Sequence, residues 1–299
     1  MLDIMKETVE DLRTSNLWLA LPSEFVGTLA ITLLGCGTWI SWQGEGPDVV
    51  RVALTFGLAV ATVVWIFGHI SGGHVNPAVT IAALFTRRVS IIRGILYIVA
   101  QVVGGIVGAG ILYGLTPSVK QGNLGSNALN ANVSASQGFG VELIVTFVYV
   151  LAVFSSLDDK RTDLRGSSPL TIGLAVVVCH LFAIPYTRAS LNPARSFGPA
   201  LIMDVWDDHW VFWVGPVAGA LLAGLLYDYI FAAGATFAGA KKCLLRTKKP
   251  RKQPEPEKAP LEEAKNEVIE IDETKLDGEK GEAIIEADPE KGKEGEEAN

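Results

Sequence analysis

Two copies of one short motif carry the side chains best suited to chemistry. Asn76-Pro77-Ala78 recurs as Asn192-Pro193-Ala194, 116 positions later in the chain. Asparagine is a favourable cap for the first turn of a helix, and proline suits the first helical position because its missing N–H needs no partner there. Each motif is therefore predicted to begin a helix, with an amide that can donate hydrogen bonds beside the positive end of the helix dipole. Each of the two amides can therefore donate a hydrogen bond to a passing oxygen atom.

Chemistry that makes or breaks covalent bonds has no candidate residues in this sequence. No nucleophile is paired with a base at a suitable spacing, and His, Cys, Asp and Glu form no cluster with metal-ligand spacing. We therefore expect no enzyme activity, no catalytic residue, no metal site and no cofactor. The three cysteines, Cys36, Cys179 and Cys243, form no disulfide framework.

The two motifs lie in a part of the chain that has too few charges for a water-soluble protein. Residues 1–240 contain 12 Lys and Arg and 15 Asp and Glu, whereas the last 59 residues contain 13 and 17. About a quarter of the residues of a soluble globular protein are charged, so the body of this protein is predicted to lie in a lipid bilayer. The 31 glycines and the scattered apolar runs also exclude a coiled coil and most nucleic-acid binders. We expect no nucleic-acid partner.

The elements that must position the motifs are apolar runs of two lengths. A bilayer is crossed by about 20 apolar residues in helical form. Two stretches that begin at the motifs, Asn76–Phe85 and Asn192–Met203, are too short to cross and have the length of re-entrant segments. Six other runs are long enough: Leu17–Trp42, Val52–Ile70, Gly94–Leu115, Gly138–Leu157, Pro169–Thr187 and Trp210–Ala233.

Six spans put both termini on the same side of the membrane, and the positive charges indicate which side. With the termini in the cytoplasm, the inner segments up to residue 252 carry 15 Lys and Arg, and the outer segments carry four. We therefore expect a plasma-membrane protein with a cytoplasmic N-terminus (residues 1–16) and a cytoplasmic tail (residues 241–299). The sequon Asn132-Val133-Ser134 then lies in an outer loop, which makes Asn132 a candidate N-glycosylation site.

The chain repeats itself, and the repeat predicts the fold. Gly57 and Gly173 are 116 positions apart, like the two motifs, and Glu24 and Glu142 are 118 apart. Each half, about residues 17–115 and 138–233, reads span, span, short segment, span. Because three spans per half is an odd number, the second half must be inverted relative to the first. We predict an all-α membrane protein of six transmembrane helices and two re-entrant half-helices, whose asparagine-bearing ends meet near the midplane.

The residues around the two motifs resemble those of one known family. Residues 68–80 read Gly-His-Ile-Ser-Gly-Gly-His-Val-Asn-Pro-Ala-Val-Thr, and residues 190–200 read Ser-Leu-Asn-Pro-Ala-Arg-Ser-Phe-Gly-Pro-Ala. These are similar to the two signatures of the aquaporins, or major intrinsic proteins, and the resemblance covers about residues 17–233. It implies an hourglass-shaped pore through each subunit and a homotetramer of four independent pores.

The resemblance also implies which residues select the permeant. The narrow outer constriction of the family would here consist of Phe56, His180, Ala189 and Arg195. Glycerol-conducting relatives typically have a small residue in place of His180 and Asp in place of Ser196. This sequence has neither and is therefore similar to the water-selective branch. It departs from some water channels at Ala189, where they carry Cys.

The predicted function is a passive, water-selective channel driven by osmotic gradients. The half-helix ends and Arg195 would set up a positive barrier to protons and metal cations, while neutral water passes. Three alternatives remain open at this point. They are a broader pore for hydrogen peroxide, urea or glycerol, an ion-coupled transporter, and a junction or adhesion protein that keeps the fold.

The remaining charged and small residues are assigned supporting roles. Glu24 and Glu142 are expected to brace the re-entrant loops, as at the matching family positions, and His69 and His74 to fix the first loop. Residues 253–299 carry 6 Lys and Arg and 17 Asp and Glu. That composition is typical of a disordered segment and could serve a cytoplasmic partner. Close helix packing is expected at four glycines with small-xxx-small spacing: Gly104, Gly108, Gly215 and Gly219.

Overall fold

A computed structural model of the chain describes residues 10–232, except 43, 45, 162, 164 and 165, and also describes residue 235. The predicted acidic tail, residues 241–299, lies outside the described residues, as do residues 1–9. The described part is helical, and all of it belongs to one compact unit.

Six helices of the described part are long and apolar enough to cross a membrane, which agrees with the predicted spans. Between them lie the short helices α4 (Pro77–Phe85) and α8 (Pro193–Met203) and a 3₁₀ turn, η1 (Ser118–Lys120). The long helices are α2 (Ser15–Gly37), α3 (Val49–Ser71), α5 (Ile91–Leu115), α6 (Ala135–Ser156), α7 (Ser168–Thr187) and α9 (Val211–Leu226), the last continued by a π-helical turn, η2 (Tyr227–Phe231).

One predicted boundary is wrong by five residues, at the end of the first span. The apolar run extends to Trp42, but α2 ends at Gly37. The hydroxyl and N–H of Thr38 both donate to the carbonyl of Gly35, and the N–H of Trp39 donates to that of Cys36. These bonds close the helix, whereas hydropathy alone continues through the turn that follows.

The helices pack in pairs at the predicted small residues. A Cβ on Gly108 would meet the carbonyl oxygen of Leu29 at 2.5 Å, so α5 lies against the backbone of α2. A Cβ on Gly219 would meet the backbone of Leu143, so α9 lies equally close to α6. A Cβ on Gly57 would meet the carbonyl oxygen of Gly173 at 2.5 Å, which joins α3 of one half to α7 of the other. The two halves are therefore paired through their glycines.

Ion pairs tie the ends of neighbouring helices together. Arg93, at the start of α5, contacts Asp11 at 2.6 Å, and Ser90 donates a hydrogen bond to the same carboxylate. Burial raises the pKa of Asp11, but the hydrogen bonds from Arg93 and Ser90 outweigh that effect and hold the pKa below its usual value. Arg88 pairs with Asp228 at 2.5 Å and lies over the ring of Phe154.

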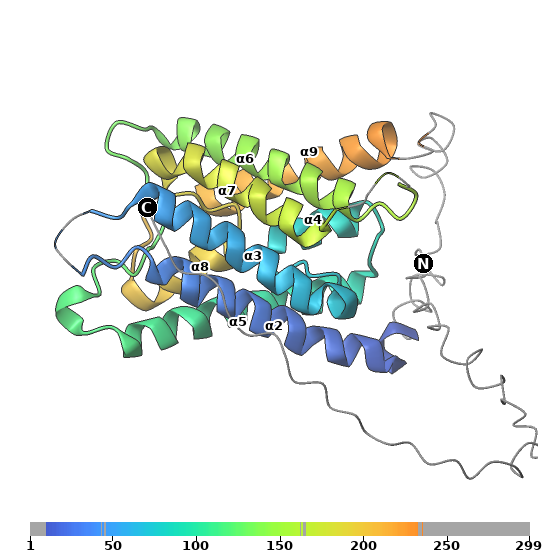
Figure 1. Cartoon of the computed structure of the whole chain (residues 1–299), viewed down its shortest axis with the longest axis horizontal. Coiled ribbons are helices and arrows are strands. Elements are labelled where there is room, and N and C mark those ends of the chain that lie inside the picture. Colours follow the sequence, from blue (N-terminus) through green and yellow to red (C-terminus); the bar gives the residue numbers. More distant parts are fainter. Residues whose placement is uncertain are drawn as a thin grey trace, which may run out of the picture. The chain divides into compact units, whose positions relative to one another are not determined.

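The two short helices enter the bundle from opposite ends. In Figure 1 the long helices lie side by side, with α4 toward one end of the bundle and α8 toward the other. Both begin as the motifs predict, with asparagine as the cap and proline at the start of the helix. The fold thus brings Asn76 and Asn192 together inside the bundle, 116 residues apart in sequence.

Candidate functional site

The two asparagines are locked to each other's loops. The Asn76 side chain accepts a hydrogen bond from the N–H of Ala78 (2.8 Å) and donates one to the carbonyl of Leu191 (2.8 Å). Asn192 accepts from Ala194 (3.0 Å) and donates to the carbonyl of Val75 (2.8 Å). A primary amide has two N–H donors, so each asparagine keeps one that these bonds do not use.

The loop carbonyls that receive these amides come from strained residues. Val75 and Leu191 precede the two asparagines and have φ of 42° and 54°. This left-handed region is costly for residues with a Cβ, above all for a β-branched one such as Val75. Surrounding bonds must therefore hold both loops in place.

Glu24 supplies these bonds in the first half. Its carboxylate accepts hydrogen bonds from the hydroxyl of Ser71 (2.6 Å), from the N–H groups of His74 (3.0 Å) and Val75 (2.6 Å), and from the amide of Gln101 (2.7 Å). The side chain is fully buried, at 0% exposure. Its predicted bracing role is confirmed.

Glu142 does the same in the second half. It accepts from the hydroxyl of Thr187 (2.6 Å) and from the N–H groups of Ser190 (2.8 Å) and Leu191 (3.0 Å). The inverted repeat thus extends from the helices to the individual hydrogen bonds of each loop.

Three of the predicted constriction residues lie together. The rings of Phe56 and His180 are stacked with their centroids 4.6 Å apart, and the guanidinium carbon of Arg195 lies 4.8 Å from the centroid of the Phe56 ring. All three side chains are buried, with 1–2% exposure. They come from α3, α7 and α8, so only the tertiary structure joins them.

Several polar atoms at this constriction have no hydrogen-bond partner among the residues that the structure describes. Arg195 donates from Nη1 to the carbonyl of Gly125 (2.8 Å), while its Nε and Nη2 have no partner in that part of the chain. His180 bonds through Nδ1 to the carbonyl of Val176 (3.0 Å), and its Nε2 is likewise unpaired there. A carbonyl only accepts, so Nδ1 carries the proton and Nε2 is a free acceptor. Two donor groups and one acceptor are therefore available for hydrogen bonds with a ligand.

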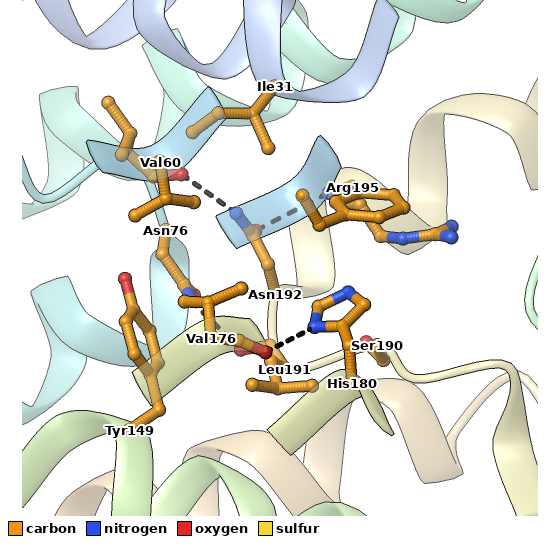
Figure 2. Close-up of a pocket in the computed structure, with 12 residues that line it drawn as sticks. Ile31, Val60, Asn76, Tyr149, Val176, His180, Ser190, Leu191, Asn192 and Arg195 are labelled. Carbon is orange, nitrogen blue, oxygen red and sulfur yellow. Dashed lines mark hydrogen bonds between the residues drawn. The ribbon is translucent and has the colours of Figure 1, made fainter. Parts of the chain in front are cut away.

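A narrow cavity connects the constriction with the asparagines (Figure 2). Its volume of about 20 Å³ is enough for about one water molecule. Ala189 is fully buried and is not among the lining residues, so its part in selection stays a prediction. The lining residues are Ile31, Phe56, Val60, Val75, Asn76, Tyr149, Val176, His180, Ser190, Leu191, Asn192 and Arg195.

Residues 11–227 match the family described as Major intrinsic protein. The chain belongs to this family. It is 54% identical to Aquaporin-4 of Mus musculus over 222 residues, which is 73% of this chain and 69% of that protein. It is 48% identical to Aquaporin-5 of Homo sapiens over 209 residues (70% and 79%) and 44% identical to the lens fiber major intrinsic protein of Gallus gallus over 249 residues (83% and 95%).

A solved structure supports the fold of this aquaporin independently. The X-ray structure of the aquaglyceroporin from Plasmodium falciparum aligns with a TM-score of 0.65 at 24% identity, and the match covers 72% of this chain and 96% of that one. The predicted fold class is confirmed. As a member of this family with Aquaporin-4 and Aquaporin-5 as relatives, the protein is a water-selective membrane channel and not an enzyme.

The apolar wall of the cavity was missed by sequence reasoning. Val60, Val176, Ile31 and Tyr149 line the cavity together with the two asparagines. A usable signal was present, because Val60 and Val176 are 116 positions apart, like the two asparagines. Apolar residues within apolar spans carry no other mark in the sequence.

The cysteines of the described part are not among the residues that line the cavity. Cys179 and Cys36 are both buried and free. The thiol of Cys179 donates to the carbonyl of Val145 on α6 at 3.2 Å. The residue before His180 thus faces a neighbouring helix, as helical geometry predicts. Cys243 lies outside the described residues.

This placement predicts that mercury compounds do not block the wild-type channel. A mercurial blocks by attaching to a thiol in the lumen, and neither described cysteine lines the cavity. Ala189→Cys should create a block that a reducing thiol reverses, because residue 189 adjoins the lining residue Ser190. The wild type and Ala189→Cys can be measured with and without the mercurial in one liposome shrinking series. Block of the wild type that vanishes in Cys179→Ser would contradict the placement of Cys179.

Proposed function

We propose that water crosses in single file, first past Phe56, His180 and Arg195 and then past Asn76 and Asn192. The observation that carries this proposal is the set of unused polar atoms around a cavity for about one water molecule. Arg195 offers donors and His180 an acceptor at the constriction, and each asparagine offers one N–H. The aliphatic side chains of Val60 and Val176, which also line the cavity, offer no competing partner. Water therefore finds hydrogen bonds along a defined line.

Ions are excluded by charge in this proposal. The N-terminal ends of α4 and α8 carry about half a positive charge each, and both ends lie at the asparagines. Arg195 adds a full charge beside the constriction. A cation would also lose its hydration shell in so narrow a space, and the apolar wall does not replace it.

The test is stopped-flow light scattering on proteoliposomes. Under a sucrose gradient, vesicles with the protein should shrink faster than empty ones, whereas glycerol or urea as the permeant should give no added flux. Fast glycerol or urea flux would favour a broader pore. Water flux equal to that of empty vesicles would favour the junction or adhesion alternative.

We further propose that the channel domain spans residues 17–233 and assembles as a homotetramer in the plasma membrane, with both termini in the cytoplasm. The charge bias of the loops supports this orientation. The many large apolar side chains exposed on the long helices, such as Trp65 and Leu222, call for cover by lipid or neighbouring subunits. Native mass in detergent tests the tetramer, and glycosidase treatment tests the use of Asn132, which is exposed.

Removing residues 253–299 should leave water permeability per channel unchanged. These residues follow the repeat and lie outside the family match, which ends at residue 227. Their proposed role is to bind a cytoplasmic partner. The measurement is water flux normalised to the amount of protein in the membrane, with the full chain as the control. A several-fold change would instead make the tail a gate.

A further inference from the structure

Tyr149 breaks the symmetry of the cavity wall. Val60 and Val176 are counterparts in the inverted repeat, and so are Ile31 and Tyr149, which are 118 positions apart like the two buried glutamates. All four line the cavity. Three are aliphatic, and Tyr149 alone brings a polar atom to this wall. The inverted repeat therefore does not explain why a tyrosine hydroxyl lies at this position of the wall.

The Tyr149 hydroxyl lies where the first asparagine faces the cavity. Tyr149 is on α6, two helical turns after Glu142, and its side chain is buried with 3% exposure. Its hydroxyl interacts with the side chain of Asn76, and Figure 2 shows the hydroxyl end of the ring next to Asn76. One N–H of Asn76 is used by Leu191. The hydroxyl thus adjoins the amide group that the proposed route leaves for water.

A hydroxyl at this point changes the energetics of passage. On an aliphatic wall, water at the asparagines bonds only to them and to its neighbours in the file. A phenol both donates and accepts, so it gives this water a lateral partner and also competes for the Asn76 amide. The first effect stabilises the state in which water is bound at this point, and the second stabilises the state in which Tyr149 is paired with Asn76. Either one raises the free-energy barrier that a water molecule must cross to move on.

We propose that Tyr149 is a further rate-determining residue of this pore, whose hydroxyl binds the permeating water beside Asn76 and slows its passage. The proposal rests on the proposed route past the asparagines and adds to it a contact that neither the repeat nor the constriction supplies. The ligand is the permeant itself, a small neutral molecule with O–H groups.

The experiment compares four proteins in stopped-flow shrinking of proteoliposomes: wild type, Tyr149→Phe, Tyr149→Ile and Tyr113→Phe. Tyr149→Phe removes one oxygen atom and keeps the ring, and Tyr149→Ile installs the side chain of the repeat counterpart. Tyr113→Phe is the matched control, because Tyr113 is exposed on α5 and outside the cavity lining. Flux is normalised to folded protein in the vesicles.

Tyr149→Phe and Tyr149→Ile should each raise water permeability about two- to tenfold, which is the range for the loss of one hydrogen bond of ordinary net strength. Their activation energies should fall, and Tyr113→Phe should match the wild type. If the wild type conducts water and both Tyr149 variants show unchanged or lower permeability, the proposed role of Tyr149 is overturned, while the proposed function stands. A wild type that conducts no water would overturn the proposed function and this inference together.

Discussion

Replacing His180 by Ala and Arg195 by Val should let urea and small polyols through while water flow continues. The two side chains border the narrow cavity, and each stacks on or lies over Phe56. His180→Ala removes the ring from this stack. Arg195→Val removes the positive charge together with the Nε and Nη2 donors, which have no partner within the described part of the chain. The asparagine pair is left intact, so the hydrogen bonds that carry water past the midpoint remain.

The measurement is solute-driven swelling of proteoliposomes with urea and with glycerol. Urea permeability should rise about tenfold or more above the wild type, which corresponds to a barrier lowered by about 1.4 kcal/mol or more. Arg51→Val is a matched control, because it removes an exposed arginine whose guanidinium bonds to the carbonyl of Thr38, away from the cavity. If the double variant excludes urea as well as the wild type does, the selective constriction lies elsewhere.

Glu142→Ala should abolish water flux and lower the stability of the folded channel. The substitution leaves the N–H groups of Ser190 and Leu191 without an acceptor among the described residues. The Thr187 hydroxyl keeps only its longer bond to the carbonyl of Ala183 (3.3 Å). Each buried unsatisfied group costs about 1–3 kcal/mol, so the two N–H groups together should cost about 2 kcal/mol or more. No carboxylate then holds Leu191 in its strained backbone conformation. Its carbonyl, which accepts the hydrogen bond from Asn76, is free to turn away.

Thermal unfolding in detergent and water flux in proteoliposomes measure the two effects. Glu142→Gln keeps one acceptor oxygen and should be intermediate, because its NH₂ group faces N–H donors. Asp207→Ala removes an exposed carboxylate from the loop before α9 and should change neither quantity. Wild-type melting and flux in Glu142→Ala would mean that other groups hold the second re-entrant loop.

The sequence alone was sufficient for the fold because its signals are local. Span length, charge depletion and the Asn-Pro starts each depend on contiguous residues, and the physics of a bilayer leaves few alternatives for them. Both half-helices therefore begin at the predicted asparagines and end at Phe85 and Met203, as predicted. The end of α2 was misplaced because a turn after Gly37, which hydropathy does not register, closes that helix.

The internal repeat also made it possible to predict how residues far apart in the sequence are related in the fold. The offset of the two motifs predicted that Asn76 and Asn192 meet, and that of the glutamates matched the bracing role expected for both. Symmetry is itself a sequence signal, so it carries information across more than a hundred positions.

Only the tertiary structure decided which atoms are paired and which remain free. Nothing near Arg195 in sequence indicates that one of its nitrogens bonds to the carbonyl of Gly125, 70 residues away, or that two others have no partner among the residues that the structure describes. Likewise, nothing distinguishes Tyr149 from other aromatic residues of an apolar span until the packing of α6 brings its hydroxyl to Asn76. The physical reason is that the cost or use of a buried polar atom depends on its neighbours in space, and those neighbours come from different helices.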